Sequence, residues 1–521
     1  MSDAFYATTP IYYVNAEPHI GHTYTTVVVD TLARYHRLAG ERCFFLTGTD
    51  EHGEKIAEVA AETGSTPQTV ADRYSAAFRG TWDKLGFSYD CFIRTTDAGH
   101  KEVVQSVLQK VYDAGQIEFR EYEGLYCVGC ERFLTERDLQ NGLCRDHERA
   151  PEPRRESSYF FKMTDHFEWL VDYIGTHPEF IRPERYRNEV LGMLRDDSGL
   201  GDLSISRPKE RLDWGIELPF DSDYVCYVWF DALINYVTGI GYPDGADFGK
   251  FWGSAQHVIA KDILKPHAVF WPCMLHAIGL EPPRHVNVHG YWTVEGRKMS
   301  KSLGNIVAPL DMQKKFGFDA FRYFLLRDMA FGSDSDFSES ALATRVNADL
   351  ANNLGNLLSR TLNMTDRYTQ ARVPEPGARG AAEEEVASAA AGTAEQVDQH
   401  LRRNEFHRAL DSIFNFADAV NRYVERQAPW KVAKDKGANW EERLATTLYT
   451  SCEALRVVAL LIAPFLPETA PRMLERLGIP DALERARLPD DAARWGLLEP
   501  GTATTKGAPL FPRVEPPPGD A

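Results

Sequence analysis

The chain begins with an alternation of apolar patterns that is typical of α/β proteins. Aromatic and β-branched residues from Phe5 to Val14 predict a strand, and Arg42–Gly48 predicts a second one. Between them, Ile20–Ala39 carries apolar residues at helical spacing, and Gly40 is well placed to end this helix. A strand, a helix and a strand in direct succession form a βαβ unit, which predicts a parallel sheet.

The α/β pattern returns late in the chain. Strands are expected at His257–Ile263 and His285–Tyr291, with a helix at His267–Ile278 between them. The intervening segment, residues 98–226, is expected to hold mostly helices and a small metal-binding knuckle. We therefore predict one Rossmann-like α/β fold that is interrupted by an insertion.

From about Ser338 onward the pattern is helical only. Residues 406–420 have apolar side chains at helical spacing, and Glu441–Ile462 is a long helix candidate, so this half predicts an all-α bundle. Ala371–Glu385 mixes Pro, Gly and Ala without a period and predicts a loop. The residues after Gly501 are rich in Pro and Gly and are expected to run extended over the surface.

Composition narrows the class of protein. The 521 residues are 43% hydrophobic and 26% charged, which fits a globular chain of several domains. The net charge of −18 argues against nonspecific nucleic-acid binding but leaves room for a local basic face. The N-terminus lacks a signal pattern, and no apolar run reaches the roughly 20 residues of a membrane helix. Eight cysteines are too few for a disulfide scaffold, so we expect a cytoplasmic protein.

The first candidate phosphate site is the motif His19-Ile20-Gly21-His22. It lies where the first strand gives way to the helix, and ligands of α/β sheets bind beside helix N-termini. The imidazoles can donate hydrogen bonds to phosphate oxygens, and the glycine lets a nucleotide approach the backbone closely. Taken alone, such a histidine pair is equally well explained as a helix cap.

The second candidate is residues 298–302, which read Lys-Met-Ser-Lys-Ser after the last expected strand. Two lysines beside serines form a cationic loop that suits a polyphosphate, because each ammonium group offsets phosphate charge. Taken alone, this pentapeptide is more typical of a solvated surface loop. In this order, the two motifs resemble the joint signature of the class I aminoacyl-tRNA synthetases.

A structural zinc site is predicted inside the insertion. Cys127 and Cys130 are followed by Cys144 and His147, a pair of short motifs whose spacing fits one tetrahedral zinc knuckle. Four protein ligands leave no open coordination position, so one zinc ion would serve to fold a segment with little core of its own. The simpler alternative is that these cysteines are unrelated. The other five resemble isolated core residues: Cys43, Cys91, Cys226, Cys273 and Cys452.

Further segments make the resemblance specific to the methionyl-tRNA synthetases. The matching stretches are Pro10–Asn15, Gly48–Gly53, Tyr227–Ala232, Lys261–Ile263, Phe270–Pro272 and Ala428–Trp430. The resemblance extends over nearly the whole chain, and a zinc-bearing insertion is also this family's arrangement. It implies that the chain activates L-methionine with ATP to methionyl-adenylate and transfers methionine to tRNA(Met) in protein synthesis.

The resemblance also implies a methionine pocket. Its residues would be Ile11, Tyr13, Trp229, Ala232, Leu233, Tyr236, Ile263, His267 and Trp271. Asp50 would bind the ammonium group of the amino acid. A thioether is polarisable and packs well on aromatic edges, which suits this set. For each aromatic residue taken singly, ordinary core packing is the alternative.

The implied catalytic residues are His19, His22, Lys298 and Lys301. The same four residues would bind ATP together with Gly21, Asp262 and Ser300. Mg²⁺ would accompany ATP and bridge its outer phosphates. Catalysis would then consist of positioning and charge stabilisation, with no side chain acting as a nucleophile.

The helical half resembles the anticodon-binding domain of the family. The positions that match its anticodon-reading residues are Asn356, Arg360 and Trp430. These residue types suit the role, since unpaired bases stack on aromatic rings and offer their edges to polar side chains. For Asn356 and Arg360 the alternative is a polar helix face. The excess of basic residues in the segment Arg297–Arg327 is expected to contact the inner bend of the tRNA.

The resemblance sets the expected domain organisation. The domains are the first catalytic Rossmann half (1–97), the connective insertion with the zinc knuckle (98–226), the second catalytic half (227–295), the Lys-Met-Ser-Lys-Ser and stem-contact region (296–355), the helical anticodon-binding domain (356–500) and the C-terminal tail (501–521). The chain ends soon after the helical half, so a monomer is expected.

Three other functions compete with this interpretation. The chain could be another class I synthetase, such as the one for cysteine. A small nucleotidyltransferase shares the H-x-G-H fold, but the length and the helical half argue against it. A catalytically silent tRNA-binding protein is disfavoured because both motifs are intact. The insertion has no room for the editing domain of the isoleucine, valine and leucine enzymes, so selectivity must come from the pocket, where one methylene is worth about 1–3 kcal/mol.

Overall fold

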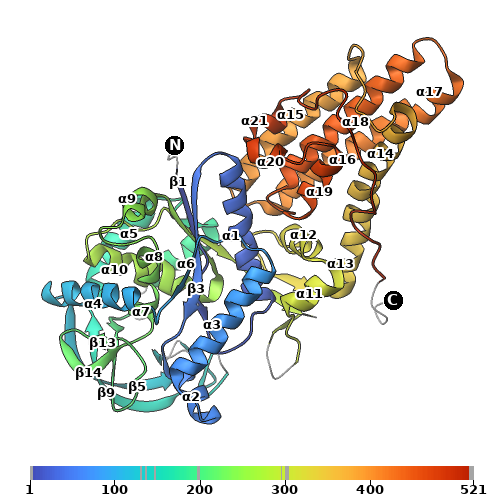
Figure 1. The fold of residues 1–521 in the computed structure, drawn as a ribbon. Helices are drawn as coiled ribbons and strands as arrows, with labels where there is room; N and C mark the ends of the chain where they lie inside the picture. The colour runs from blue at the N-terminus through green and yellow to red at the C-terminus, as the bar shows by residue number, and fades with distance from the viewer. Residues whose placement is uncertain are drawn as a thin grey trace. The chain divides into compact units, whose positions relative to one another are not determined.

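The computed structural model describes residues 4–128, 132–134, 138–145, 148–195, 200–294, 296–299 and 304–515, without the side chains of residues 122, 132, 133, 155, 156 and 298. The chain forms two compact units (Figure 1). The first unit contains residues 1–18 and 44–289, and the second contains residues 19–43 and 290–521.

A parallel sheet forms the centre of the first unit. Its strand order is β10 (Ile181–Arg182), β16 (His285–His289), β15 (Ala255–Ala260), β1 (Ala4–Thr8), β3 (Arg42–Asp50) and β2 (Tyr12–Tyr13), and β4 (Cys91–Arg94) also pairs with β3. The β10–β16, β16–β15, β15–β1, β3–β2 and β3–β4 pairs are all parallel. The predicted Rossmann-like fold is confirmed.

Most helices of this unit pack on the sheet through one large apolar cluster. The helices of the first unit are α2 (Glu54–Thr63), α3 (Pro67–Lys84), α4 (Ala98–Asp113), α5 (Phe167–Thr176), α6 (Glu184–Arg195), α7 (Trp229–Ala232), α8 (Asn235–Thr238), α9 (Ala246–Phe251) and α10 (Trp271–Ala277). Tyr6 and Val288 of the sheet share a buried cluster with Val107 of α4 and Met274 of α10. The alternation of strands and apolar helix faces therefore produces one large cluster here, whereas α2 and α3 pack with Val14 in a separate, smaller one.

Three sequence-based boundaries are wrong in this unit. The expected strand Phe5–Val14 is two strands, β1 and β2, because Pro10 has no backbone N–H to continue a ladder. The expected strand His257–Ile263 ends at Ala260 and continues as a 3₁₀ turn, η4 (Lys261–Ile263). The expected helix His267–Ile278 begins as a π-helical turn, η5 (Pro266–Phe270), before α10.

The insertion contains more strands than expected. One antiparallel sheet has the order β11 (Leu203–Ser204), β9 (Glu152–Phe161), β5 (Ile117–Cys127) and β6 (Arg132–Leu134), and a second has β12 (Ser206–Pro208), β14 (Asp221–Cys226) and β13 (Glu217–Leu218). A short hairpin joins β7 (Leu139–Gln140) to β8 (Leu143–Cys144). The alternation of apolar and charged residues from Ile117 to Glu121 was a usable strand signal.

Helices dominate the second unit. They are α1 (Ile20–Leu38), α11 (Pro309–Phe316), α12 (Phe318–Asp328), α13 (Glu339–Arg345), η6 (Val346–Gly355, π-helical), α14 (Asn356–Thr369), α15 (Ala381–Arg402), α16 (Phe406–Gln427), α17 (Pro429–Asp435), α18 (Trp440–Ile462), α19 (Thr469–Arg476), α20 (Ala482–Arg485) and α21 (Asp490–Ala493). A small sheet joins β17 (Trp292–Val294) to β18 (Arg297–Lys298) and β19 (Ser335–Phe337). The predicted all-α bundle is confirmed.

The predicted helices Ile20–Ala39 and Glu441–Ile462 each differ from the structure by one residue at one end, whereas the helical spacing found over residues 406–420 continues in α16 to Gln427. Helix α1 ends at Leu38, and Gly40 follows with a φ of 80°. The expected loop Ala371–Glu385 is wrong from Ala381, where α15 begins and Glu383 accepts a hydrogen bond from the backbone of Gly380. The cap was missed because its glycine and glutamates lie in an Ala-rich stretch with little period.

Helix α18 is long and apolar enough to cross a membrane by length and composition alone. However, 94% of its most apolar window is buried against the rest of the protein. This burial is typical of the core helix of a bundle, because a bundle helix that is apolar on all faces must be covered on all faces.

Candidate functional site

The histidines of the H-x-G-H motif form the N-terminal cap of α1. Nδ1 of His19 accepts a hydrogen bond from the backbone N–H of Gly21 (3.1 Å), and Nδ1 of His22 accepts one from the backbone N–H of His19 (3.4 Å). The two rings are stacked with their centroids 3.8 Å apart. The capping alternative is therefore correct for the Nδ1 edges of both rings.

Burial keeps both imidazoles neutral, and the caps determine which ring nitrogen carries the proton. Burial lowers the pKa of His19 to about 4, and burial together with His19 lowers the pKa of His22 well below its usual value. Both rings are then neutral near pH 7, and because each Nδ1 accepts a hydrogen bond, each ring proton lies on Nε2. The result is a pair of Nε2–H donors at a helix N-terminus, where the helix dipole also favours an anion.

Gly21 has a further reason to be a glycine. A Cβ at this position would lie 3.0 Å from Cε1 and 3.2 Å from Nδ1 of His19. Because His19 must stay in place to cap the helix, a side chain at residue 21 would disturb the cap itself. The close approach of a nucleotide, which the sequence suggested, remains a prediction.

The lysine-serine loop lies mostly outside the described residues. The backbone of Lys298 belongs to β18 and pairs with Thr293, whereas the side chain of Lys298 and all of Ser300 and Lys301 are outside the described part of the chain. The predicted roles of these residues therefore rest on the sequence.

The predicted methionine residues gather in the first unit. Leu233, Tyr236 and Trp271 belong to one buried cluster, and Ile11, Trp229 and Ile263 pack against it. The rings of Tyr236 and Trp271 lie 6.0 Å apart, and Trp229 meets Phe270 edge to face at 6.5 Å. The structure thus assembles an aromatic cluster from positions that are up to 260 residues apart in the chain, from Ile11 to Trp271.

Hydrogen bonds orient the polar groups of this cluster. Nδ1 of His267 donates to the carbonyl oxygen of Ile263 (2.8 Å), so Nε2 of the neutral ring accepts from the hydroxyl of Tyr236 (2.7 Å). Burial lowers the pKa of His267 to about 4, which keeps this ring neutral. The cluster is therefore apolar and uncharged, as a thioether side chain requires.

Asp50 supplies negative charge near this cluster. It ends β3, is 7% exposed, and stands opposite Tyr13 in the parallel β2–β3 pair. Burial raises the pKa of Tyr236, and Tyr12 and Asp50 raise it further. Asp262, the predicted ribose contact, is exposed in η4 just after the carboxyl end of β15.

One aromatic-cluster residue was missed. His257 is buried, its Nε2 accepts from the indole N–H of Trp271 (3.1 Å), and its ring stacks on Tyr236 at 4.0 Å. Its Nδ1 therefore carries the proton and donates to Oγ1 of Thr8 (2.9 Å). The sequence did not indicate that His257 belongs to the cluster, because a histidine in a strand is usually a core residue whose hydrogen bonds are satisfied.

Half of the predicted zinc site lies within the described residues. Cys127 ends β5, Cys144 ends β8, and both are buried in a small cluster with Leu134 and Leu139. Cys130 and His147 lie outside the described part of the chain. Two thiol groups from separate hairpins in one small core fit the donor set of a zinc knuckle.

Two of the three predicted anticodon residues meet in the second unit. The guanidinium group of Arg360 lies over the ring of Trp430 at 5.6 Å, and its Nη1 lies 3.6 Å from a carboxylate oxygen of Glu425. Trp430 is 39% exposed, which is unusual for so large an apolar side chain. Asn356 is exposed one helical turn before Arg360 on α14.

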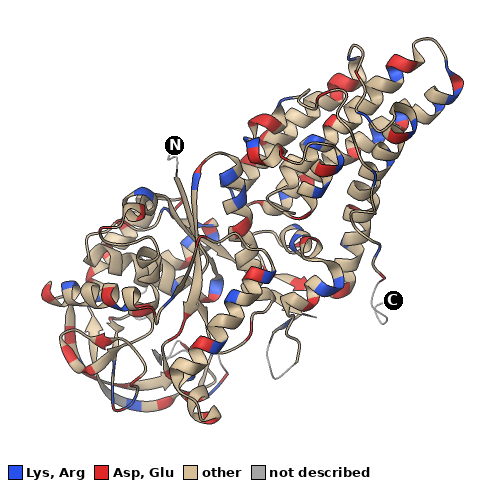
Figure 2. Ribbon diagram, viewed as in Figure 1, with Lys and Arg blue, Asp and Glu red and all other residues tan. Residues whose placement is uncertain are grey.

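The expected basic face at Arg297–Arg327 is partly wrong. Arg322 is fully buried and bonded to Asp30, Arg327 is paired with Asp411, and Lys315 is paired with Glu339. Blue and red positions alternate over the helices of this unit (Figure 2). A count of charged residues along the chain could not reveal which of them are already neutralised by partners.

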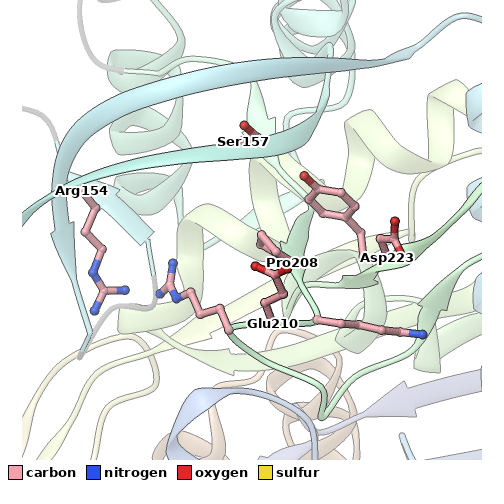
Figure 3. A pocket seen from close by; sticks show the side chains of 8 residues that line it. Arg154, Ser157, Pro208, Glu210 and Asp223 are labelled. Carbon is pink, nitrogen blue, oxygen red and sulfur yellow. The ribbon is translucent and has the colours of Figure 1, made fainter.

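A hollow of 860 Å³ opens in the insertion, and none of the predicted substrate residues lines it. Its lining is Arg154, Ser157, Pro208, Lys209, Glu210, Arg211, Asp223 and Tyr224 (Figure 3). Charges of both signs line it, and Lys209 and Arg211 are already paired with Glu217 and Glu54. This hollow is therefore not the aromatic site that methionine would need.

Comparison with known families divides the chain in two. The family described as class I tRNA synthetases (M) matches residues 5–144 and 136–362. The family described as the anticodon binding domain of methionyl tRNA ligase matches residues 373–517. Together these matches cover nearly all of the chain.

Similar proteins agree with this division. The methionine–tRNA ligase of Deinococcus radiodurans is 48% identical over 98% of this chain and 75% of its own length. That of Streptomyces coelicolor is 42% identical over 98% of this chain and 97% of its own length. The structure of Mycobacterium tuberculosis methionyl-tRNA synthetase in complex with methionyl-adenylate matches with a TM-score of 0.93 at 40% identity, over 98% of this chain and 100% of that one.

Proposed function

The chain belongs to the methionine–tRNA ligase family of class I aminoacyl-tRNA synthetases, and from this we propose how its own residues divide the work. The family's enzymes join an amino acid to tRNA. We assign methionine to the aromatic cluster around Tyr236 and Trp271, with Asp50 opposite its ammonium group. The observation that carries this assignment is the neutral, hydrogen-bonded His267–Tyr236 pair inside an otherwise apolar cluster.

ATP is assigned to the N-terminus of α1. The Nε2–H groups of His19 and His22 would donate to phosphate oxygens, and Lys298 and Lys301 would offset the charge of the outer phosphates. Mg²⁺ bound with ATP would supply positive charge that neutralises part of the charge of the phosphates. The methionine carboxylate would attack the α-phosphate with release of pyrophosphate, and a ribose hydroxyl at the tRNA 3′ end would then attack the methionyl carbonyl with release of AMP.

Amino-acid-dependent pyrophosphate exchange tests the proposed function. The purified chain is expected to exchange labelled pyrophosphate into ATP with methionine, and to do so with far lower kcat/KM for cysteine, leucine, isoleucine and valine. Exchange driven best by cysteine would favour the alternative synthetase. Exchange without any amino acid would favour a nucleotidyltransferase, and no exchange at all would favour a silent tRNA-binding protein.

Trp430 and Arg360 are proposed to stack on and contact the anticodon. A Trp430→Ala variant is expected to raise the KM for tRNA(Met) in aminoacylation by roughly tenfold, because stacking is worth about 1–3 kcal/mol per base. Pyrophosphate exchange should stay within about twofold of the wild type, since it does not involve tRNA. Trp440→Ala is the matched control, because Lys436 covers this tryptophan as Arg360 covers Trp430. Equal losses in both assays, or equal effects of both variants, would contradict the assignment.

We propose that one structural zinc ion is held by Cys127, Cys130, Cys144 and His147. The burial of Cys127 and Cys144 in one small cluster supports this assignment. We expect a Cys144→Ser variant to bind less than one tenth of the wild-type zinc by metal analysis, because a hydroxyl is a poor replacement for a thiolate ligand. Cys452→Ser, which changes a buried cysteine of α18, should keep its zinc. Full zinc occupancy in the Cys144 variant would refute the ligand set.

Thiolate ligands also need a reducing compartment, so we propose a cytoplasmic location.

A further inference from the structure

A buried carboxylate joins three segments of the first unit. Oδ2 of Asp231 accepts a hydrogen bond from Nδ1 of His52 (2.6 Å), and Oδ1 accepts one from Nε2 of His100 (2.8 Å). Asp231 and both imidazoles are almost completely buried. A buried charge of this kind is retained only where its hydrogen bonds are complete, so the arrangement defines the positions of all three side chains.

Two of the three segments carry residues of the proposed methionine site, and the third contacts α8, which holds Tyr236. His52 lies two residues after Asp50, at the end of β3. Asp231 lies in α7 between Trp229 and Ala232. His100 lies in α4 of the insertion, and its Nδ1 also contacts Oγ1 of Thr238 in α8 (3.3 Å).

The backbone next to Asp231 has a strained conformation that such hydrogen bonds can hold in place. Val228, which precedes α7, has a φ of 30°, a conformation that β-branched residues rarely adopt. A strained residue persists only where neighbouring contacts hold it. On the other side, the His52 ring packs at 5.3 Å from Trp214, whose indole N–H donates to the carbonyl oxygen of Glu51 (2.6 Å). Asp231 therefore follows a strained backbone position that neighbouring contacts must hold, and its partner His52 is held by Trp214.

The charge on the carboxylate is maintained. Burial raises the pKa of Asp231, but attraction to His52 and the hydrogen bonds from His100 and His52 lower it by more, to about 2. Asp231 therefore accepts hydrogen bonds at both oxygens throughout the working range of pH.

We propose that Asp231 is a positioning residue that sets the affinity for methionine, by holding Asp50 and Trp229 at a fixed separation through His52. The ammonium group and the side chain of methionine must reach these two residues at once, so a small displacement of β3 relative to α7 weakens both contacts together. Displacements of about 1 Å at a site are enough to lose much of its effect. This inference rests on the proposed function, because it assigns Asp231 to the same methionine site.

A crossed pair of substitutions tests the hydrogen bonds themselves. Asparagine places an amide N–H near the position of Nδ1, and glutamine places one near Nε2. Because His52 bonds through Nδ1 and His100 through Nε2, His52→Asn and His100→Gln should keep the KM for methionine within about threefold. His52→Gln, His100→Asn and Asp231→Asn should raise it by about tenfold, the effect of losing one hydrogen bond to a charged group.

The readout is the KM for methionine against the KM for ATP in pyrophosphate exchange. A variant that merely folds poorly has a lower active fraction, which lowers apparent kcat and leaves both KM values unchanged. His166→Gln is the matched control, because His166 is also a buried imidazole with two side-chain partners, Gln116 and His276. It should leave the KM for methionine unchanged.

The outcomes separate this inference from the proposed function. Equal KM values for the two His52 variants, or equal rises in the KM for methionine and ATP, would overturn the positioning role. The variants that are expected to raise the KM for methionine could fail to fold. In that case His52→Asn and His100→Gln still test the positioning role, since a tenfold rise in the KM for methionine in either variant would also overturn it. A wild-type chain without methionine-dependent exchange would instead overturn the proposed function.

Discussion

An Asp50→Asn variant is expected to lose most of its methionine activation, with kcat/KM for methionine in pyrophosphate exchange lower by about 30- to 5,000-fold. The variant keeps the shape of the side chain and removes only its charge. Loss of one partner of a buried charge pair costs about 2–5 kcal/mol, and Asp50 is 7% exposed, so little water is present to replace it. The substrate ammonium group would then meet a neutral amide.

The KM for ATP separates this effect from a general loss of structure. It should remain within about twofold of the wild-type value, because Asp50 is assigned only to the amino acid. Asp113→Asn is a suitable control, since Asp113 is an exposed carboxylate at the end of α4 that accepts a hydrogen bond from Gln109. A variant of Asp50 with unchanged kcat/KM would show that another group neutralises the ammonium charge.

The largest effect on stability is expected from Arg322→Met in the second unit. Arg322 is 0% exposed, its Nη1 donates to Asp30 (2.6 Å), and its other nitrogens donate to Thr31 and to the carbonyl oxygens of Pro464 and Phe465. The residue thereby joins α12 to α1 and to the turn after α18. The variant would leave the buried Asp30 carboxylate with only its 2.8 Å ion pair to the partly exposed Arg34, and breaking a buried ion pair costs about 3–5 kcal/mol. Calorimetry should show a melting temperature lower by roughly 10 °C.

Two comparisons test the cause of this loss. Arg345→Met removes an arginine that is 38% exposed and paired with Asp328, and it should change stability by less than about 1 kcal/mol. The double variant Arg322→Met, Asp30→Asn should recover part of the loss, because it removes the buried carboxylate charge that has lost its buried partner and keeps only the partly exposed Arg34. A melting temperature of the Arg322 variant within about 2 °C of the wild type would disprove the structural role given to this pair.

Local signals in the sequence were sufficient for several elements. The helix at Ile20–Ala39 was predicted with its glycine stop, and helices over residues 406–420 and Glu441–Ile462 were predicted from their apolar spacing; each matches an observed helix, α1, α16 or α18. Periodicity and caps involve residues within a few positions of one another, so a single sequence contains them. The site residues were harder, and their assignment came from the resemblance to a family rather than from the spacing of the aromatic residues.

The sequence by itself determined that an α/β part precedes a helical part, and it determined the two signature motifs and the spacing of the proposed zinc ligands. Only the tertiary structure decided that both motif histidines point their Nδ1 edges into a helix cap, that Arg322 is buried, and that Asp231 bonds His52 and His100. These last partners are 179 and 131 positions apart along the chain. Such contacts depend on which surfaces the fold buries together, and no local pattern of residues contains that information.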